Sequence, residues 1–318
     1  MVPSIERIVE DIKFGEGPHW DIQSQSLYFV DYLNKSINRY VPATKSHFKA
    51  NLGEKYSSFV IPIEGQQQKF VIGVEKEIAT VKWNGVENNI EELHKLIKLD
   101  DLDNKNILND GKCDVAGRLW TGTLRGDVIN IIAHTTDESE KTLSANNGGS
   151  FYSYSNSLKK HLDGVDISNG IAWNKSNTKM FYNDTLKKRV DQFDFDVETG
   201  EISNREVLFS FERNEVGGLP DGMTIDDEDN LWIAVYRGSK IIKISSKIPD
   251  TLLEIINMPA KQVTSMAWGG EKLDELYVTT ANFSEIPVGI HTSEPVDGSL
   301  YRITGLNAKG LPMNKFKL

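Results

Sequence analysis

Cysteine and long apolar segments are almost absent from this sequence of 318 residues. Cys113 is the single cysteine, so no disulfide can form within the chain, as is typical of proteins from a reducing compartment. No segment approaches the roughly 18 consecutive apolar residues of a membrane helix, and no apolar run near residue 1 resembles a secretory signal. We therefore expect a cytoplasmic protein. The C-terminal Phe316-Lys317-Leu318 resembles a peroxisomal address with phenylalanine in place of a small residue, and this is the weaker alternative.

The sequence also lacks an excess of positive charge. It has 36 lysines and arginines against 46 acidic residues, which gives a formal net charge of −10. Nucleic acids and anionic membrane surfaces are bound by basic surfaces, so neither is an expected partner. No feature points to an obligate protein partner, and a small-molecule substrate is the expected ligand.

Several catalytic signatures are missing as well. The six histidines do not have the paired spacing of a zinc site. No nucleophile elbow, phosphate-binding loop or dinucleotide fingerprint is present. Cys113 has no identifiable basic partner and is interpreted as a small apolar residue within a strand. His19 is interpreted as a packed or surface residue rather than a ligand.

What the sequence does contain is a repeated strand pattern. Short hydrophobic strands that follow a polar turn are predicted at 26–31, 69–74, 117–122, 179–184, 230–235 and 275–280. Several are followed by a second strand with alternating apolar and polar residues, as at 35–41, 189–195 and 240–245. Six copies at intervals of roughly 45 to 60 residues predict an all-β fold, a six-bladed β-propeller.

The repeat runs through the whole chain and no linker interrupts it, so residues 1–318 are predicted to form a single domain. Helical periodicity is weak. The segment 91–99 is the one place where a short helix is expected, with a pair of strands as the alternative. The polar segment 133–147 is predicted to be a loop between blades.

Four short motifs spread along the chain each combine an oxygen-bearing side chain with a nearby glycine. The side chains are those of Glu16, Asn109, Asn169 and Asp221. The adjacent glycines predict tight turns that point these side chains out of loops. A propeller would bring the four motifs to its central channel from blades 1, 3, 4 and 5. Two carboxylates and two amides at one axis are ligands suited to a hard divalent cation.

Longer stretches around these motifs resemble a known family. They include Gly-Glu-Gly-Pro-His-Trp at 15–20, Leu-Asn-Asp-Gly-Lys at 108–112, Ser-Asn-Gly-Ile-Ala-Trp at 168–173 and Pro-Asp-Gly-Met at 220–223. Together they are similar to the family of senescence marker protein 30, gluconolactonase and luciferin-regenerating enzyme, which includes regucalcin. The similarity runs nearly the full length, and it is greatest to the insect branch.

The resemblance implies a six-bladed propeller that holds one divalent cation in the central channel, with calcium preferred over manganese, magnesium or zinc. It places the metal ligands at Glu16, Asn169 and Asp221, and it makes Asp221 the candidate general base. Asn109 and Asp127 match positions that contact the substrate. These roles are implied by the family and not by the spacing of the residues.

One departure from the family concerns the substrate. Members that hydrolyse sugar lactones carry arginine two residues before the asparagine of Asn-Asp-Gly, and here this substrate-facing position is Ile107. Arginine binds hydroxyls and carboxylates through charged hydrogen bonds, which isoleucine cannot do. The sequence therefore favours a less polar substrate than a sugar lactone.

Three functions fit these observations. The first is a divalent-metal-dependent hydrolase of a lactone or related ester, similar to gluconolactonase. The second is a calcium-binding protein of the regucalcin type without catalysis. The third is an enzyme of the luciferin-regenerating type that acts on an aromatic heterocycle, and Ile107 is consistent with it because it makes the pocket less polar.

Overall fold

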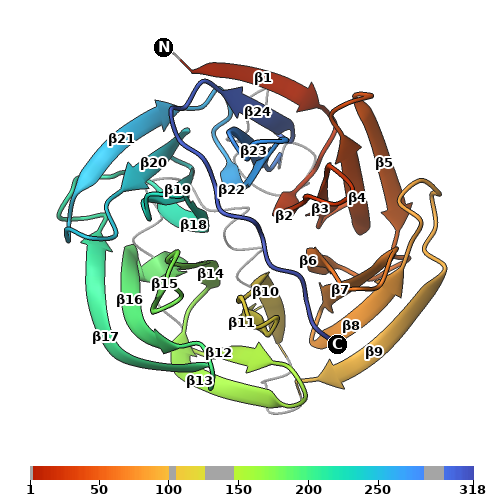
Figure 1. Cartoon of the computed structure of the whole chain (residues 1–318), viewed down its shortest axis with the longest axis horizontal. Coiled ribbons are helices and arrows are strands. Elements are labelled where there is room, and N and C mark those ends of the chain that lie inside the picture. The colour runs from red at the N-terminus through yellow and green to blue at the C-terminus, as the bar shows by residue number, and fades with distance from the viewer. Residues whose placement is uncertain (1–2, 100–104, 126–146, 283–296) are drawn as a thin grey trace.

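The computed structural model describes residues 3–99, 105–125, 147–282 and 297–318. Within these residues, six four-stranded antiparallel sheets lie around a common axis (Figure 1). This arrangement is a six-bladed β-propeller, which confirms the predicted fold. The described part of the chain contains no helix with the length and apolar character that a membrane crossing requires.

Each blade begins with an inner strand beside the axis and continues outward. The inner strands are β2 (Gly15–Asp21), β6 (Ser57–Pro62), β10 (Asn106–Cys113), β14 (Ser168–Trp173), β18 (Leu219–Ile225) and β22 (Val263–Gly269). The second strands are β3 (Ser26–Asp31), β7 (Lys69–Val74), β11 (Leu119–Arg125), β15 (Lys179–Asp184), β19 (Leu231–Tyr236) and β23 (Glu275–Thr280). Both sets are largely buried, because each is covered by neighbouring strands and neighbouring blades.

The outer half of each blade is more exposed. The third strands are β4 (Ser36–Val41), β8 (Glu77–Lys82), β12 (Gly149–Tyr154), β16 (Arg189–Asp196), β20 (Lys240–Ile244) and β24 (Leu300–Thr304). The outermost strands are β5 (Ser46–Asn51), β9 (Glu92–Lys98), β13 (Leu158–Val165), β17 (Glu201–Ser210), β21 (Leu252–Asn257) and β1 (Ser4–Val9). A 3-10 helix, η2 (Thr185–Lys187), follows β15.

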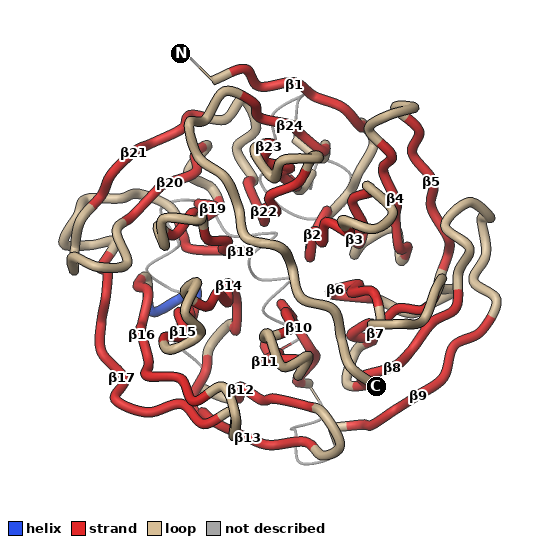
Figure 2. Tube along the Cα trace, in the orientation of Figure 1, coloured by secondary structure: helices blue, strands red, loops and turns tan. Residues whose placement is uncertain are grey.

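The N-terminal strand closes the ring. β1 pairs with β24 as the outermost strand of blade 6, so Ser4 lies opposite Thr304. The segment after β24 crosses one end of the central channel as a loop (Figure 2). There it is held by backbone hydrogen bonds, among them those from the N–H of Phe316 to the carbonyl of Pro62 and from the N–H of Lys317 to that of Gly117.

The hydrophobic core lies between adjacent blades. Trp232 of blade 5 and Trp268 of blade 6 are both fully buried and meet edge to face, with ring centroids 5.2 Å apart. Large aromatic side chains contribute much buried apolar area for each residue, which stabilises the contact between sheets. These two tryptophans therefore pack blade 5 against blade 6.

The prediction of a helix at 91–99 is wrong. Leu93, Leu96 and Ile97 have helical spacing, but the segment forms β9 and pairs with β8. Strand pairing outweighs the local periodicity because a sheet edge is available there. The predicted loop at 133–147 falls, apart from its last residue, outside the described residues.

Candidate functional site

The four predicted motifs lie within or at the start of inner strands and not in loops. In all six inner strands, pairing with the second strand shifts near the same end of the blade; the shifts fall between Glu16 and His19, Ser57 and Val60, Leu108 and Gly111, Ser168 and Ile171, Pro220 and Met223, and Val263 and Ser265. Such β-bulges bend a strand and redirect its side chains. The bulges therefore aim these side chains at the channel, a task that the sequence analysis had assigned to loop turns.

The glycines have a different role from the one predicted. A Cβ on Gly170 would lie 2.7 Å from the carbonyl oxygen of Asp221, and one on Gly222 would lie 2.1 Å from Ser265 Oγ. In both cases the neighbour belongs to the inner strand of the next blade. These glycines therefore allow adjacent inner strands to approach closely, which brings the site side chains together.

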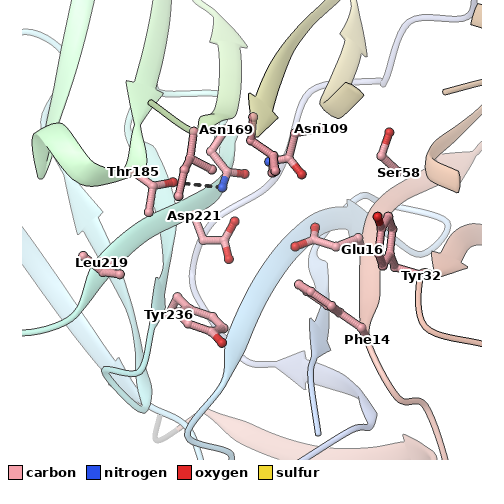
Figure 3. Close-up of a pocket in the computed structure, with 12 residues that line it drawn as sticks. Phe14, Glu16, Tyr32, Ser58, Asn109, Asn169, Thr185, Leu219, Asp221 and Tyr236 are labelled. Carbon is pink, nitrogen blue, oxygen red and sulfur yellow. Dashed lines mark hydrogen bonds between the residues drawn. The ribbon is translucent and has the colours of Figure 1, made fainter. Parts of the chain in front are cut away.

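Each bulge places one oxygen-bearing side chain at an equivalent position. The six residues are Glu16, Ser58, Asn109, Asn169, Asp221 and Thr264. The first five line a single pocket at one end of the channel (Figure 3). Thr264 is turned away and donates a hydrogen bond to the carbonyl of Gly15 at 2.6 Å. Ser58 was missed because a serine pair carries no motif, although blade-to-blade register would have located it.

Both site amides are oriented by hydrogen bonds from their nitrogen atoms. Asn169 Nδ2 donates to Thr185 Oγ1 at 3.0 Å, and Asn109 Nδ2 donates to the carbonyl of Ser168 at 2.7 Å. Because the nitrogens are engaged, the Oδ1 atoms remain available and point into the shared space (Figure 3). Each amide thus presents its oxygen atom to the pocket.

Of the two site carboxylates, Asp221 is buried and Glu16 is half-buried, and both point into the same space (Figure 3). Burial raises the pKa of Asp221 well above its usual value, and Asp110 raises it further, while a hydrogen bond from Asn169 lowers it. Burial likewise raises the pKa of Glu16, with added contributions from Asp221 and Asp110. A buried carboxylate without a compensating cation is costly to ionise. Ionisation of these two carboxylates is therefore unfavourable unless a cation binds beside them.

Asp110 and Lys112 are two channel residues that the sequence analysis did not single out. Burial raises the pKa of Asp110, and Lys112 opposes that rise. Lys112 Nζ donates to the carbonyl of Met223 at 2.6 Å. When ionised, Glu16, Asp110 and Asp221 carry three negative charges against the single positive charge of Lys112. This group of four residues therefore has an excess of two negative charges.

The residues present fit a divalent cation. Asp221 Oδ1 is buried and has no hydrogen-bond partner among the described residues. The donor set is all oxygen, with two carboxylates and two amides, as hard cations require. Within the described ranges, no three histidine, cysteine, aspartate or glutamate side chains form a metal-binding group by themselves, so the amides are needed to complete the set.

Apolar side chains surround the polar floor of the pocket. Phe14, Tyr32, Leu219 and Tyr236 line it, and so do Leu124 and Ile167. Ile107 packs against Leu124 and Ile167 but is not itself among the described lining residues. Asp127, the other predicted substrate contact, lies outside the described residues.

His19 and Cys113 are buried within inner strands. Burial lowers the pKa of His19 to about 3, so the imidazole is neutral at physiological pH. Burial raises the pKa of the Cys113 thiol, which stays protonated and is a poor nucleophile. Neither residue lines the pocket that holds the four motifs, in agreement with a structural role for both.

Comparison with known proteins agrees with this fold. Residues 14–282 match the family described as "SMP-30/Gluconolactonase/LRE-like region". Regucalcin from Macaca fascicularis is 33% identical over 305 residues, covering 95% of this chain and 94% of that protein. Regucalcin from Xenopus laevis is 31% identical over 316 residues, covering 98% of each. The chain therefore belongs to the SMP-30/gluconolactonase/LRE-like family.

Solved structures give the same result. A luciferin-regenerating enzyme superposes with a TM-score of 0.90 at 40% identity, covering 99% of this chain and 100% of that one. A regucalcin from Agrobacterium tumefaciens superposes with a TM-score of 0.81 at 20% identity, covering 99% of this chain and 98% of that one. At that identity, the second likeness bears on the fold alone.

Proposed function

We propose that this protein is a divalent-metal-dependent hydrolase of a lactone or related ester, with its active site at the pocket end of the central channel. Glu16, Asn169 and Asp221 would hold the cation, for which calcium is the first candidate and manganese, magnesium and zinc are the others. The observation that carries this proposal is the convergence of amide oxygens with carboxylates whose negative charges, when ionised, outnumber the positive charge of Lys112. Membership of a family that includes gluconolactonases supports it.

A bound divalent cation would polarise the carbonyl of the lactone and stabilise negative charge on its oxygen. The chain itself would position the substrate and move the proton. Asn109 Oδ1 faces the pocket and would accept a hydrogen bond from the attacking water or from the substrate. The surrounding apolar residues would exclude other water molecules.

Asp221 is the proposed general base. Its Oδ1 atom has no partner among the described residues and is free to accept a proton. As the water oxygen attacks the carbonyl carbon, one water proton would move to this carboxylate. Cleavage of the ring C–O bond would return the proton to the departing oxygen, so the product is a hydroxy acid.

Hydrolysis measured after chelation, and again with each cation restored singly, tests this function. The substrates should pair a sugar lactone with an apolar lactone. We expect turnover that depends on the cation and favours the apolar lactone, because apolar side chains surround the polar floor of the pocket. Ile107, which replaces the arginine of sugar-lactone hydrolases, packs against two of these side chains. Cation binding without turnover on either lactone would contradict the hydrolase and favour the calcium-binding alternative.

An enzyme of the luciferin-regenerating type is the second candidate. The aromatic residues Phe14, Tyr32 and Tyr236 line the pocket, and a luciferin-regenerating enzyme is 40% identical to this chain. Aromatic rings suit a flat heterocyclic substrate. Turnover of aromatic heterocycles, with none on either lactone, would favour this function over the first.

A further inference from the structure

Thr185 is a buried residue whose side chain contacts one of the proposed cation ligands. It is the first residue of η2 and follows β15 directly. Its Oγ1 accepts a hydrogen bond from Asn169 Nδ2 at 3.0 Å, and both residues are at most 5% exposed. We infer that Thr185 is a positioning residue that sets the orientation of the Asn169 amide toward the cation. This inference rests on the proposed cation site.

The orientation matters because the two ends of an amide have opposite chemistry. The oxygen can bind a cation, whereas the nitrogen carries two hydrogen-bond donors and repels one. The two ends are similar in size, so sterics alone distinguish them poorly. Thr185 supplies an acceptor on the side away from the pocket centre (Figure 3). That bond acts together with the hydrogen bond that Asn169 donates to Asp221, and both favour the orientation in which Asn169 Oδ1 faces the pocket.

Thr185 is itself held in place by its neighbours. Its N–H donates to the carbonyl of Ile167 at 3.1 Å. The Asp184 carboxylate accepts the N–H groups of Asp166 and Ile167, both at 2.9 Å. The two residues Asp184 and Thr185 thus fix both the backbone that leads into β14 and the side chain of Asn169.

Other blades make the same backbone bond without the same side chain. The equivalent N–H groups belong to Tyr32 in blade 1, Glu75 in blade 2 and Ala281 in blade 6. Of these four equivalent residues, Thr185 alone has a short hydroxyl, and its blade also contributes an amide at the bulge. The pairing of hydroxyl and amide is therefore specific to blade 4 within this set.

Cation affinity measured by calorimetry with calcium chloride, after chelation, tests the inference directly. Thr185→Val keeps the shape and removes the acceptor, and we expect a loss of affinity of about 10- to 100-fold, as for other partners of metal ligands. Thr185→Ser restores the acceptor and should bind within about threefold of the wild type. Thr280→Val is the matched control, because Thr280 is buried and its hydroxyl bonds Ser299 in blade 6.

A second background separates orientation from general damage. In Asn169→Asp both ends of the side chain are oxygen, so orientation no longer matters. We therefore expect Thr185→Val to change affinity by less than about twofold in that background, which is a double-mutant coupling. Equal losses in both backgrounds, or no recovery with Thr185→Ser, would overturn the inference.

The inference and the proposed function fail in different ways. If the wild type binds none of the four cations, the proposed site is wrong whatever Thr185 does. If the wild type binds a cation and Thr185→Val binds it equally well, the site stands and the positioning role is wrong. Thermal unfolding of Thr185→Val and Thr280→Val identifies any loss that comes from destabilisation alone.

Discussion

Blades 1 and 4 build the same backbone around the site but hold their site side chains differently. Asp31 accepts the N–H groups of Lys13 and Phe14, as Asp184 accepts those of Asp166 and Ile167. At the position of Thr185, blade 1 has Tyr32, whose ring stacks on Tyr56 with centroids 4.9 Å apart. In both blades an aspartate carboxylate accepts two backbone N–H groups, an arrangement that we call the aspartate clamp. The next residue is Thr185, with a short hydroxyl, in blade 4 and Tyr32, with an aromatic ring, in blade 1.

The difference follows from the chemistry of the two proposed ligands, Glu16 and Asn169. Glu16 accepts a hydrogen bond from the N–H of Gly17, its neighbour in the chain, at 3.2 Å, and within the described residues its carboxylate has no tertiary anchor. A carboxylate presents oxygen at either end and needs no orientation, whereas the amide of Asn169 does. Blade 4 therefore holds its neutral side chain in one orientation before any cation binds. In the proposed site, the charged side chain of blade 1 would be fixed by the cation itself.

The largest expected effect comes from removing the proposed base. Asp221→Ala should lower hydrolysis by about 10²- to 10⁴-fold, the usual contribution of a general base, and more if cation binding is also lost. Steady-state kinetics with calorimetry on the same sample separate the two causes. If hydrolysis persists while the cation still binds, Asp221 is not the base.

Replacing Asp31 or Asp184, the two clamp aspartates, should lower the free energy of unfolding, and more so for the aspartate that accepts more hydrogen bonds. Asp31 also accepts two hydrogen bonds from Asn34, at 3.3 Å and 2.7 Å, beyond the two that it shares in kind with Asp184. We expect Asp31→Asn to cost about 2–4 kcal/mol and Asp184→Asn about 1–2 kcal/mol, because hydrogen bonds to charged groups are the stronger ones. Urea unfolding in chelator measures both. A larger loss of stability for Asp184→Asn than for Asp31→Asn would contradict this account of the two aspartates.

The Asp184 clamp should also respond to pH. Burial raises the pKa of Asp184 from 3.8 to about 6, although the N–H groups of Ile167 and Asp166 oppose the rise. Between these values the folded protein binds more protons than the unfolded one, so the stabilisation that comes from proton binding to Asp184 is full below pH 3.8 and is lost as pH rises through 6, whereas its hydrogen bonds to the backbone remain. Wild-type stability should therefore fall relative to Asp184→Asn across that window. Unfolding of both proteins at several pH values measures the difference, and parallel curves would contradict it.

The smallest effect concerns the charge of Glu16 without a cation. Because its pKa is raised by burial and by Asp221, Glu16→Gln should stabilise the chelated protein by about 0.5–2 kcal/mol. Asn169→Asp adds a buried carboxylate beside Asp221 and should destabilise the same protein. Thermal unfolding in chelator and then in calcium tests both signs. If Glu16→Gln and Asn169→Asp changed stability in the same direction and by the same amount, the distinction drawn between the site side chains of blades 1 and 4 would be wrong.

The sequence predicted the second strands more accurately than the inner ones. The predicted spans 26–31, 69–74, 179–184 and 275–280 coincide with β3, β7, β15 and β23, because strands that are covered on both faces are continuous apolar runs. The inner strands contain Asn, Asp, Gly and Pro at their bulges, and these residues are typical of turns. Their strand character comes from pairing with neighbours, which local sequence does not encode.

The site was predictable where a side chain carries its own chemistry. Glu16, Asn109, Asn169 and Asp221 came from motifs, and the structure brings all four to one pocket. Thr185 could not be found in this way, because its importance depends on a contact with a residue sixteen positions away.

Ring closure through β1 has a consequence for how the chain is made. During synthesis, residues 4–9 emerge long before their partner strand at 300–304. The edge of β24 and the strand β1 stay unpaired until then, and a contact across so long a stretch of sequence forms slowly. We expect the nascent protein to remain an open arc of blades for most of translation. The ring closes when the edge of β24 pairs with β1, and this is the stage at which another chain could compete for the same edge.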